Sequence, residues 1–456
     1  MLGFMGQVEH INGIINGLVW GPYMLVLLVG TGIWFTLRTN GLQVRKFGYT
    51  MKETLMKIFE KPEAASADGD ITPFQALATA LAATIGTGNI AGVATAIALG
   101  GPGAIFWMWV SAFFGMMTKF AEVVLAIQYR EKNAEGSWVG GPMYYIEKGL
   151  GLKWLAIIFS IFGALAAFGI GNMVQANSVA AALQASFNIP PLYTGIFLAA
   201  AAALVILGGL KRIASVTEKI VPFMAVFYII GALIILVLNI SGLPTAFALI
   251  FKHAFTPAAA VGGFAGAVVM TAMRRGIARG VFSNEAGLGS APIAHAAART
   301  DHPVRQGLWG IFEVFADTIV ICTLTALTIL STGVWSSGLS GAALTTEAFN
   351  HGLPGNLGGI IVAIGIFFFA FSTILSWAYY GEKCAEHLLG TKFNMLYRII
   401  WLPLIVVGAI GGLELIWDVA DTLNGLMAIP NLIGLIGLSG VVFKLTKEFF
   451  SSKLAK

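Results

Sequence analysis

The sequence predicts an all-α polytopic membrane protein with about eleven transmembrane helices, on the strength of two observations. First, 57% of the 456 residues are hydrophobic and only 11% are charged, whereas soluble proteins are about one quarter charged. Second, long apolar runs recur along the chain and match the length of about 20 residues that a helix needs to cross a bilayer. This composition excludes a soluble enzyme, a disordered chain and a small secreted domain.

Apolar runs define the predicted helices, because a segment in lipid must satisfy its own backbone hydrogen bonds. None of the runs alternates between apolar and polar residues as the strands of a membrane barrel do. The seventh run is too long for one straight span and carries arginines in its first half, so we expect two half-helices with a break between them. The eleven runs cover residues 13–37, 73–99, 103–129, 154–185, 193–210, 219–241, 258–298, 308–332, 355–380, 396–413 and 419–443.

The distribution of basic residues predicts the orientation, because cytoplasmic loops are enriched in Lys and Arg. With the N-terminus outside, the inward-facing segments hold 22 of the 27 Lys and Arg residues. The outward side holds Lys252, Arg274, Arg275 and Arg279, and Lys119 lies within a span. We therefore expect a cytoplasmic C-terminus in a cell (inner) membrane. The net charge of +5 then reports cytoplasmic loops and does not indicate nucleic-acid binding.

Two polar, glycine-containing segments interrupt the second and seventh runs: residues 83–92 (ATIGTGNIAG) and residues 282–292 (FSNEAGLGSAP). The starts of these runs are five spans apart, an odd number, so the second segment crosses the membrane in the opposite sense, as in inverted-repeat transporters. The alternative is close helix packing, which small residues commonly provide in membranes. Both segments also carry Asn, Thr, Ser or Glu, which are costly in lipid when unpaired. That combination favours a functional site.

The chemistry of a broken helix suits a zwitterion. Amide N–H groups at the start of the second half-helix form a partial positive pole for a carboxylate. Carbonyl groups at the end of the first half-helix form a negative pole for an ammonium group or a small cation. Two such breaks facing each other predict an amino acid site, and the oxygens of the backbone, Thr and Ser would also suit an alkali cation.

Six stretches of the sequence resemble the alanine or glycine:cation symporter family, which belongs to the amino acid–polyamine–organocation superfamily. The resemblance implies uptake of alanine or glycine coupled to sodium, sometimes to protons. It also implies the LeuT-like five-plus-five inverted repeat with one extra N-terminal helix. The expected limits are 13–37 for the extra helix, 73–241 and 258–443 for the repeats, and 444–456 for a cytoplasmic tail. The stretches are residues 84–94, 101–109, 171–175, 279–292, 379–383 and 420–425.

By resemblance, both breaks and two further spans contribute to the substrate site. Thr84 and Gly88 should meet the substrate carboxylate, and Gln175 should add a polar contact. Trp377 should cap the pocket, and its bulk favours a small amino acid. Because a hydrophobic pocket rejects an extra methylene by only about 1–3 kcal/mol, larger side chains must be excluded by direct clash. The second break should line the ammonium side and one wall with Phe282, Ser283, Asn284 and Glu285.

A sodium site is expected between the first break and the ninth span. The resemblance implies backbone oxygens of Ala82 and Ile85, the Ala370 carbonyl and the hydroxyls of Ser372 and Thr373 as ligands. A shift of the alignment by one residue would exchange the two hydroxyls. Alternatively, each hydroxyl bonds back to its own helix, as Ser and Thr in membrane helices usually do.

Several charges within the predicted spans, or at their ends, require an explanation, because an unpaired charge at this depth is costly. Glu285 is protonated, paired, or close to a cation or the substrate ammonium. A proton-carrying role competes with that of a hydrogen-bonded acid that shapes the pocket. Asp317 has no partner that the sequence reveals.

Two further pairs are predicted. Arg279 and Asp421 are expected at the outer end of the protein, where they would help to close an outer gate, unless they form a static pair or are two solvated charges. Lys119 and Glu122 are three residues apart on one span and are expected to pair along a helical face.

No covalent chemistry is required, so an enzyme is not expected, and the coupling sodium ion is the only predicted cofactor. A channel would need an uninterrupted polar pore, and an intramembrane enzyme would need a catalytic pair that Asp317 alone does not supply. The expected partners are alanine or glycine, sodium and the lipid bilayer. The closest alternative is a proton-coupled or other-substrate amino acid transporter of the same superfamily. The sequence leaves open the choice between alanine and glycine, between sodium and protons, and the oligomeric state.

Overall fold

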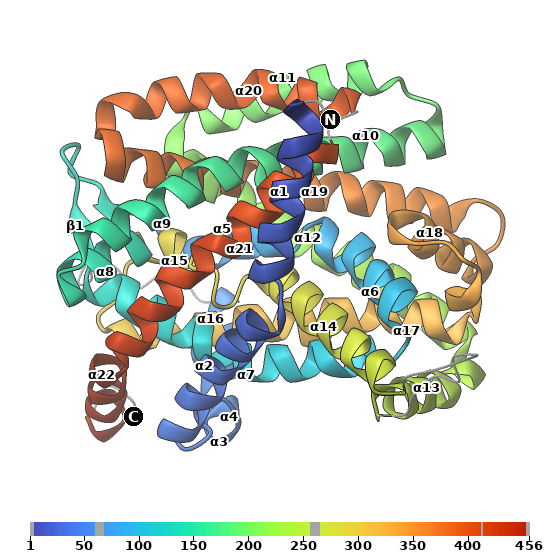
Figure 1. The fold of residues 1–456 in the computed structure, drawn as a ribbon, viewed down its shortest axis with the longest axis horizontal. Helices are drawn as coiled ribbons and strands as arrows, with labels where there is room; N and C mark the ends of the chain where they lie inside the picture. Colours follow the sequence, from blue (N-terminus) through green and yellow to red (C-terminus); the bar gives the residue numbers. More distant parts are fainter. Residues whose placement is uncertain (1–3, 60–67, 256–264, 412–413, 453–456) are drawn as a thin grey trace.

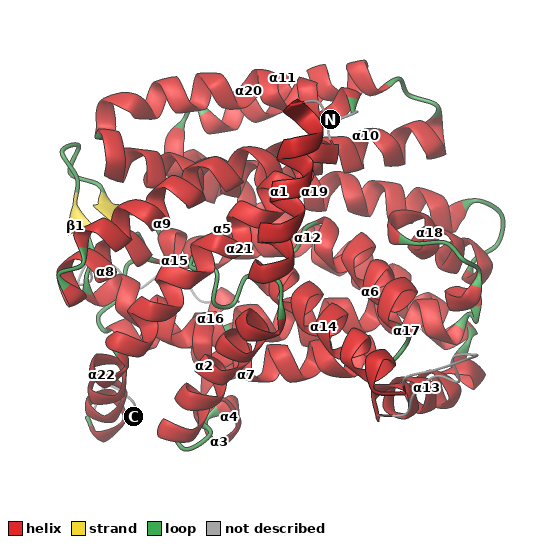
Figure 2. Cartoon of the chain, in the orientation of Figure 1, coloured by secondary structure: helices red, strands yellow, loops and turns green. Residues whose placement is uncertain are grey.

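The computed structural model describes residues 4–59, 68–255, 265–411 and 414–452, and most of them are helical (Figures 1 and 2). Eight helices in these ranges are long and apolar enough to cross a membrane, or nine if the bent pair Pro73–Thr84 and Gly88–Gly100 is one span. The chain is therefore a multi-pass membrane protein. A small antiparallel hairpin, β1 (Glu131–Lys132) and β2 (Trp138–Val139), is attached to one end of the bundle.

The described residues thus contain at most nine helices long and apolar enough to be spans, and not the predicted eleven, for two reasons. The fifth run forms a helix of only 16 residues, Pro191–Ile206. The seventh run is interrupted, as described below. Residues 258–264 of that run, residues 412–413 of the tenth run and the tail residues 453–456 lie outside the described ranges.

The first half of the chain contains the extra N-terminal helix and the first broken span. Thr72 and Gln75 form a capping box that starts the broken span, with Pro73 at its first position, a conformation that proline prefers. The helices of this half are α1 (Phe4–Val19), α2 (Pro22–Arg38), α3 (Leu42–Arg45), α4 (Phe47–Glu53), η1 (Leu55–Phe59), α5 (Pro73–Thr84), η2 (Gly88–Gly92), α6 (Val93–Gly100), α7 (Ala104–Gln128), α8 (Pro142–Leu150), α9 (Lys153–Ala166), η3 (Ala167–Met173), α10 (Val174–Phe187), α11 (Pro191–Ile206), α12 (Gly209–Leu238), η4 (Ile240–Gly242) and α13 (Leu243–Phe255).

The second half repeats the pattern of one broken span followed by long helices. Its elements are α14 (Ala265–Asn284), α15 (Pro292–His295), α16 (Pro303–Val314), η5 (Phe315–Cys322), α17 (Thr323–Ser331), η6 (Val334–Ser336), α18 (Gly341–Gly352), α19 (Leu357–Leu389), η7 (Thr391–Phe393), α20 (Asn394–Ile410), α21 (Glu414–Gly437) and α22 (Ser439–Ser451).

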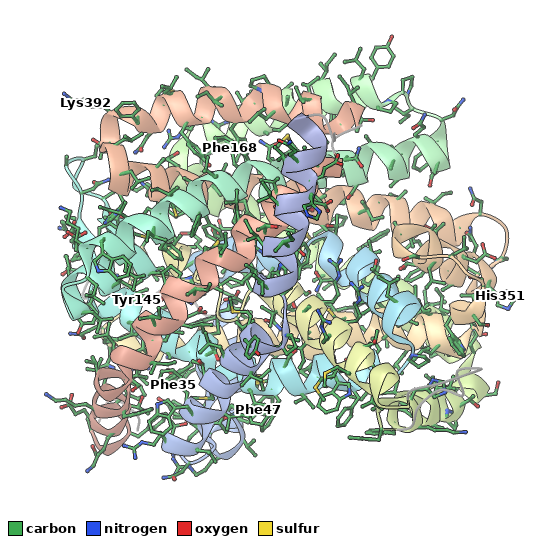
Figure 3. All side chains as sticks on the ribbon, in the orientation of Figure 1. Phe35, Phe47, Tyr145, Phe168, His351 and Lys392 are labelled. Carbon is green, nitrogen blue, oxygen red and sulfur yellow. The ribbon has the colours of Figure 1, made fainter. Side chains whose placement is uncertain are left out.

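Packing brings the broken spans to the middle of the bundle. α7 packs on α14 and α16, and α19 packs on α5, α9 and α10. α11 and α20 lie side by side along one edge (Figure 1). There Phe168 of η3, which Figure 3 labels, stacks on Tyr397 of α20 with ring centroids 4.7 Å apart. η2, η3 and η5 are π-helical, a conformation often found at functional sites.

Candidate functional site

The first break separates α5 from η2 and bends the span by 49°. The backbone leaves the helix at Ile85, with φ −77° and ψ 80°. The side chain of Asn89 stabilises the break, since its Oδ1 accepts a hydrogen bond from the Gly86 amide at 2.9 Å. A Cβ atom on Gly86 would stand 2.7 Å from Thr373 Oγ1. Glycine is therefore required for the close approach of this break to α19.

The second break follows α14, where three residues adopt positive φ: Glu285 (55°), Gly287 (95°) and Gly289 (83°). The amides of Gly287 and Gly289 donate to Glu122 Oε1 of α7 at 3.0 and 3.1 Å. These contacts replace the missing helical bonds. The expectation of two half-helices is corrected in one respect, because the positive φ values prevent helix formation before Pro292 and leave only the single turn of α15.

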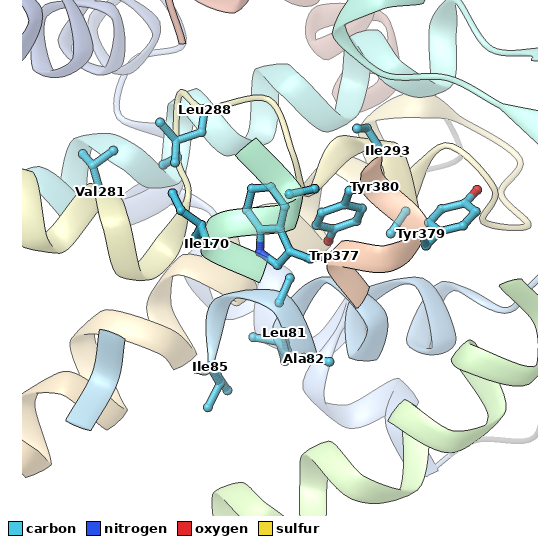
Figure 4. Close-up of a cluster of buried hydrophobic side chains, with 14 of the residues drawn as sticks. Leu81, Ala82, Ile85, Ile170, Val281, Leu288, Ile293, Trp377, Tyr379 and Tyr380 are labelled. Carbon is cyan, nitrogen blue, oxygen red and sulfur yellow. The ribbon is translucent and has the colours of Figure 1, made fainter. Parts of the chain in front are cut away.

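The two breaks border a small cavity. Six of the predicted substrate-site residues line it. Figure 4 shows the Trp377 ring close to Ile170, with both residues in the cavity wall. The lining residues are Ala83, Thr84, Gly86, Thr87, Gly88, Ile170, Gln175, Phe282, Glu285, Thr373, Trp377 and Asn424.

Two predicted site residues turn their side chains away from this cavity and toward η5. The Ser283 hydroxyl donates to Asp317 Oδ2 at 2.9 Å. The Asn284 amide donates to Thr318 Oγ1 at 3.0 Å. Their side chains hold the second break in place and do not line the cavity wall.

The carboxylate of Glu285 is fixed within the wall. Its Oε1 accepts a hydrogen bond from Trp377 Nε1 at 3.0 Å, and its Oε2 accepts one from the Ser290 hydroxyl at 2.5 Å. The side chain is 3% exposed. Of the roles left open by the sequence, this geometry corresponds to a hydrogen-bonded acid that shapes the pocket.

Asp317 of η5 joins the two breaks, a relationship that the sequence did not reveal. Its Oδ1 accepts from Asn89 Nδ2 of the first break at 2.6 Å. Its Oδ2 accepts from Ser283 of the second break at 2.9 Å and from Thr318 at 2.7 Å. A buried acid satisfied in this way rigidifies the segments that bond to it.

Four oxygens gather beside the first break, where the sodium site was predicted. Thr373 Oγ1 and Ser372 Oγ lie 2.9 and 3.3 Å from the Ala82 carbonyl oxygen, and both lie 2.9 Å from the Phe369 carbonyl oxygen. Both hydroxyls thus lie within hydrogen-bonding distance of two carbonyl oxygens, one on each of the two helices. Carbonyl and hydroxyl oxygens are ligands that hard cations prefer. The hydroxyls also bond back to their own helix, as the alternative expected.

The predicted pair of Arg279 and Asp421 is not in contact. Asp421 Oδ2 instead accepts from Asn16 Nδ2 of α1 at 3.0 Å, and its carbonyl accepts from Trp20 Nε1 at 3.2 Å. The guanidinium of Arg279 lies over the Phe282 ring, 5.4 Å from its centroid. In this conformation the extra N-terminal helix therefore holds the carboxylate, and the role of Arg279 and Asp421 at an outer gate stays a prediction.

The predicted pairing of Lys119 with Glu122 is also replaced. Lys119 Nζ lies 3.2 Å from Glu313 Oε1, and Glu313 Oε2 lies 3.1 Å from His295 Nε2. Glu122 is engaged by the backbone amides of the second break, including Gly287. The three side chains of the Lys119–Glu313–His295 chain are fully buried.

The segments at the start of α5 and after α15 lie side by side. Ile71 and Ala298 form a parallel bridge. Arg130, which follows α7, donates to the carbonyl oxygens of Ala296 at 3.0 Å, Ala298 at 2.7 Å and Asp68 at 2.8 Å. Burial lowers the pKa of the Arg130 guanidinium, which nevertheless stays charged at neutral pH. Arg130 therefore clamps the same ends of the two broken spans together.

A helical membrane bundle with two broken spans around a central cavity defines a secondary transporter. Solved structures share this fold. MhsT in complex with L-phenylalanine matches with a TM-score of 0.59 and 14% identity, over 80% of this chain and 89% of that chain. The manganese transporter of Eremococcus coleocola, bound to an aromatic bis-isothiourea substituted compound, matches with a TM-score of 0.53 and 14% identity, over 82% of this chain and 81% of that chain. The LeuT-like fold predicted from the sequence is confirmed.

The chain belongs to the sodium:alanine symporter family, whose model matches residues 5–456. The sodium/alanine symporter AgcS of Methanococcus maripaludis is 57% identical, over 98% of this chain and 98% of its own. The probable sodium/glutamine symporter GlnT of Bacillus subtilis is 43% identical, over 98% of this chain and 92% of its own. The protein is thus a transporter and not an enzyme, and its family couples amino acid transport to sodium.

Proposed function

We propose that the protein carries alanine, and also glycine, into the cell together with sodium by alternating access. The observation that carries this proposal is the double role of Thr373, which lines the cavity and also belongs to the oxygen cluster around the Ala82 carbonyl. A cation in that cluster and a substrate in the cavity would share a wall. Each would then favour the binding of the other, and coupling is a binding free energy shared between two sites.

In this proposal the substrate carboxylate faces the backbone of the first break near Thr84 and Gly88. Gln175, Phe282, Glu285 and Trp377 form the remaining walls. The proposed sodium ligands are the Ala82 and Ile85 backbone oxygens, the Ala370 carbonyl and the hydroxyls of Ser372 and Thr373. The Phe369 carbonyl lies 2.9 Å from both hydroxyls, close to the same cluster. The bulk of Trp377, Phe282 and Ile170 around the cavity supports a small substrate.

Alternating access requires closure on one side at a time. The N-terminus would lie outside, so the bridge between Ile71 and Ala298, with Arg130 across it, would be the closed inner gate. The two repeats, 73–241 and 258–443, would rock against each other to open it. The alternative within the same fold is a proton-coupled carrier or a carrier of another amino acid. Glutamine is one candidate, because the relative GlnT is a probable sodium/glutamine symporter.

Calorimetric titration of the purified protein tests the proposal. Alanine is titrated in sodium chloride and in potassium chloride at equal ionic strength and pH, with glycine and glutamine as further ligands. We expect alanine and glycine to bind at least about tenfold more tightly in sodium, a coupling free energy of about 1.4 kcal/mol. Equal affinity in the two salts would overturn sodium coupling, and preferential binding of glutamine would overturn the substrate.

A further inference from the structure

Asn424 of α21 lies in the cavity wall but has no role in the site described so far. Its side chain is 1% exposed. Its Oδ1 accepts no hydrogen bond from any residue that the structure describes. Buried polar atoms are almost always hydrogen-bonded, and an amide oxygen in a membrane bundle has no bulk water to turn to. An unsatisfied acceptor on a cavity wall therefore points to a ligand that donates.

Gln175 presents a second oxygen of the same kind. It is 3% exposed, and its Nε2 donates to the Ile170 carbonyl oxygen at 2.9 Å. This bond fixes the amide and leaves Oε1 without a donor among the described residues. A Cβ atom on Gly86 would stand 3.7 Å from Oε1, so the oxygen faces the first break. Asn424 and Gln175 are the two lining residues of the described chain that carry such an atom.

Only one end of an amino acid can satisfy these oxygens. A carboxylate accepts hydrogen bonds and donates none, whereas an ammonium group donates three and accepts none. Each oxygen of the Glu285 carboxylate already accepts one hydrogen bond, from Trp377 or from Ser290. An ammonium group with three donors therefore needs further acceptors. Neutral amide oxygens also bind an ammonium group without cancelling its charge.

We propose that Asn424 Oδ1 and Gln175 Oε1 accept hydrogen bonds from the ammonium group of the substrate and select a primary α-amine, an inference that rests on the proposed amino acid transport. α1 holds α21 in position for this contact. Asn16 and Trp20 bind Asp421, which lies one turn from Asn424 on α21. A Cβ atom on Gly425 would collide with Val19, so α1 and α21 are in close contact. The extra N-terminal helix thus supports one wall of the cavity.

The test compares alanine with N-methylalanine, which has one N–H donor fewer, by calorimetric titration in sodium chloride. Asn424→Leu removes the acceptor and keeps the number and branching of the side-chain heavy atoms, and Asn424→Asp keeps an acceptor. Asn177→Ala is the matched control, because Asn177 lies outside the cavity on α10 and makes one 3.3 Å bond to the Gly408 carbonyl. A second readout is the rise in Tm that sodium alone causes, since an ion that binds the folded state stabilises it.

We expect Asn424→Leu to bind alanine at least about tenfold more weakly, as the loss of a charge-assisted hydrogen bond implies. Its preference for alanine over N-methylalanine should shrink, and its sodium-induced rise in Tm should stay. Asn424→Asp should bind alanine within about threefold of the parent protein, and Asn177→Ala should resemble the parent. If Asn424→Leu is not monodisperse, Asn424→Ala takes its place with the same expectations.

Unchanged alanine affinity in Asn424→Leu or Asn424→Ala would overturn the inference, because the Asn424 oxygen would then make no contact with the substrate that matters for binding. Loss of the sodium-induced rise in Tm together with alanine binding would also overturn it, because the residue would then be structural. Failure of the parent protein to bind alanine would instead overturn the proposed function, which separates the two failures.

Discussion

The indole Nε1 of Trp377 donates a hydrogen bond to Glu285 Oε1 at 3.0 Å, although 92 residues separate the two in the chain. Trp377 belongs to α19, and Glu285 is the first residue of the second break. The bond therefore ties a long continuous helix to the break and forms one wall of the cavity. Together with the bond from Ser290, it explains why an acid is tolerated at this buried position.

Trp377→Phe should raise the KM for alanine about tenfold in proteoliposome uptake. The substitution keeps an aromatic ring but leaves Glu285 Oε1 without its donor, which costs about 1–3 kcal/mol for a buried acceptor. In the double variant with Glu285→Ala, little further loss is expected beyond that of Glu285→Ala alone, because both changes remove the same bond. Strictly additive losses would contradict this coupling.

Glu285→Gln alone should retain part of the sodium-dependent uptake, with the same pH dependence as the parent protein. The amide still offers an oxygen to Trp377 and a polar group to Ser290. In the proposed mechanism Glu285 carries no proton. Initial uptake rates between about pH 5.5 and 8.5 check this, a range that spans ordinary physiological titrations. A flattened pH profile in the variant would favour the proton-carrier role instead.

Gly86→Ala should weaken sodium binding. The new Cβ would meet Thr373 Oγ1 at 2.7 Å, and crowding of this kind costs about 1–3 kcal/mol. The sodium concentration for half-maximal uptake should rise about tenfold. Gly92→Ala is the control on η2, because a Cβ there meets nothing within 4 Å. If the two variants behave alike, the close approach of Gly86 to Thr373 does not matter for function.

Asn89→Asp should abolish most uptake, because it places a second carboxylate against Asp317 and removes the 2.6 Å hydrogen bond between the breaks. Adding Asp317→Asn should recover a large part, since the pair then again consists of one amide and one acid. Uptake and Tm are measured for both single variants and the double variant. A double variant no better than Asn89→Asp would show that this link does not organise the breaks.

Arg130→Gln should loosen the proposed inner gate. The variant loses the charge-assisted bonds to the Ala296 and Ala298 carbonyls, each worth about 1.5–3 kcal/mol. A cysteine placed by Ala298→Cys should then react at least about fivefold faster with a membrane-impermeant maleimide added to the cytoplasmic side. Lys132→Ala is the control, because Lys132 stacks on Trp138 but does not contact the bridge. Equal labelling rates would argue against a gate at this bridge.

Local patterns in the sequence predicted the parts of the site that depend on local geometry. Glycines with polar neighbours marked both breaks, and the structure bends or unwinds the chain at Gly86 and from Glu285 to Gly289. The hydroxyls of Ser372 and Thr373 lie beside the Ala82 carbonyl next to the first break, where the resemblance implied a sodium site. Their bonds to the Phe369 carbonyl are the contacts that hydroxyls commonly make with carbonyls three or four residues earlier in a helix. The set of sodium ligands stays a prediction.

Partners distant in the sequence could not be predicted. Lys119 was assigned to Glu122 by helical spacing, yet the amides of the second break engage Glu122, and Lys119 pairs with Glu313. Asp421 was assigned to Arg279, but Asn16 of α1 takes its carboxylate. Each outcome depends on which helices pack together, and spacing along one helix carries no information about that.

Sodium-coupled symport of alanine is tested most directly by the uptake of radiolabelled alanine into proteoliposomes containing the purified protein. External sodium is replaced by potassium at fixed pH and ionic strength, with protein-free liposomes as the background. We predict saturable uptake that concentrates alanine when sodium moves down its concentration gradient, and uptake near background in potassium. Equal uptake in sodium and potassium would contradict sodium-coupled symport.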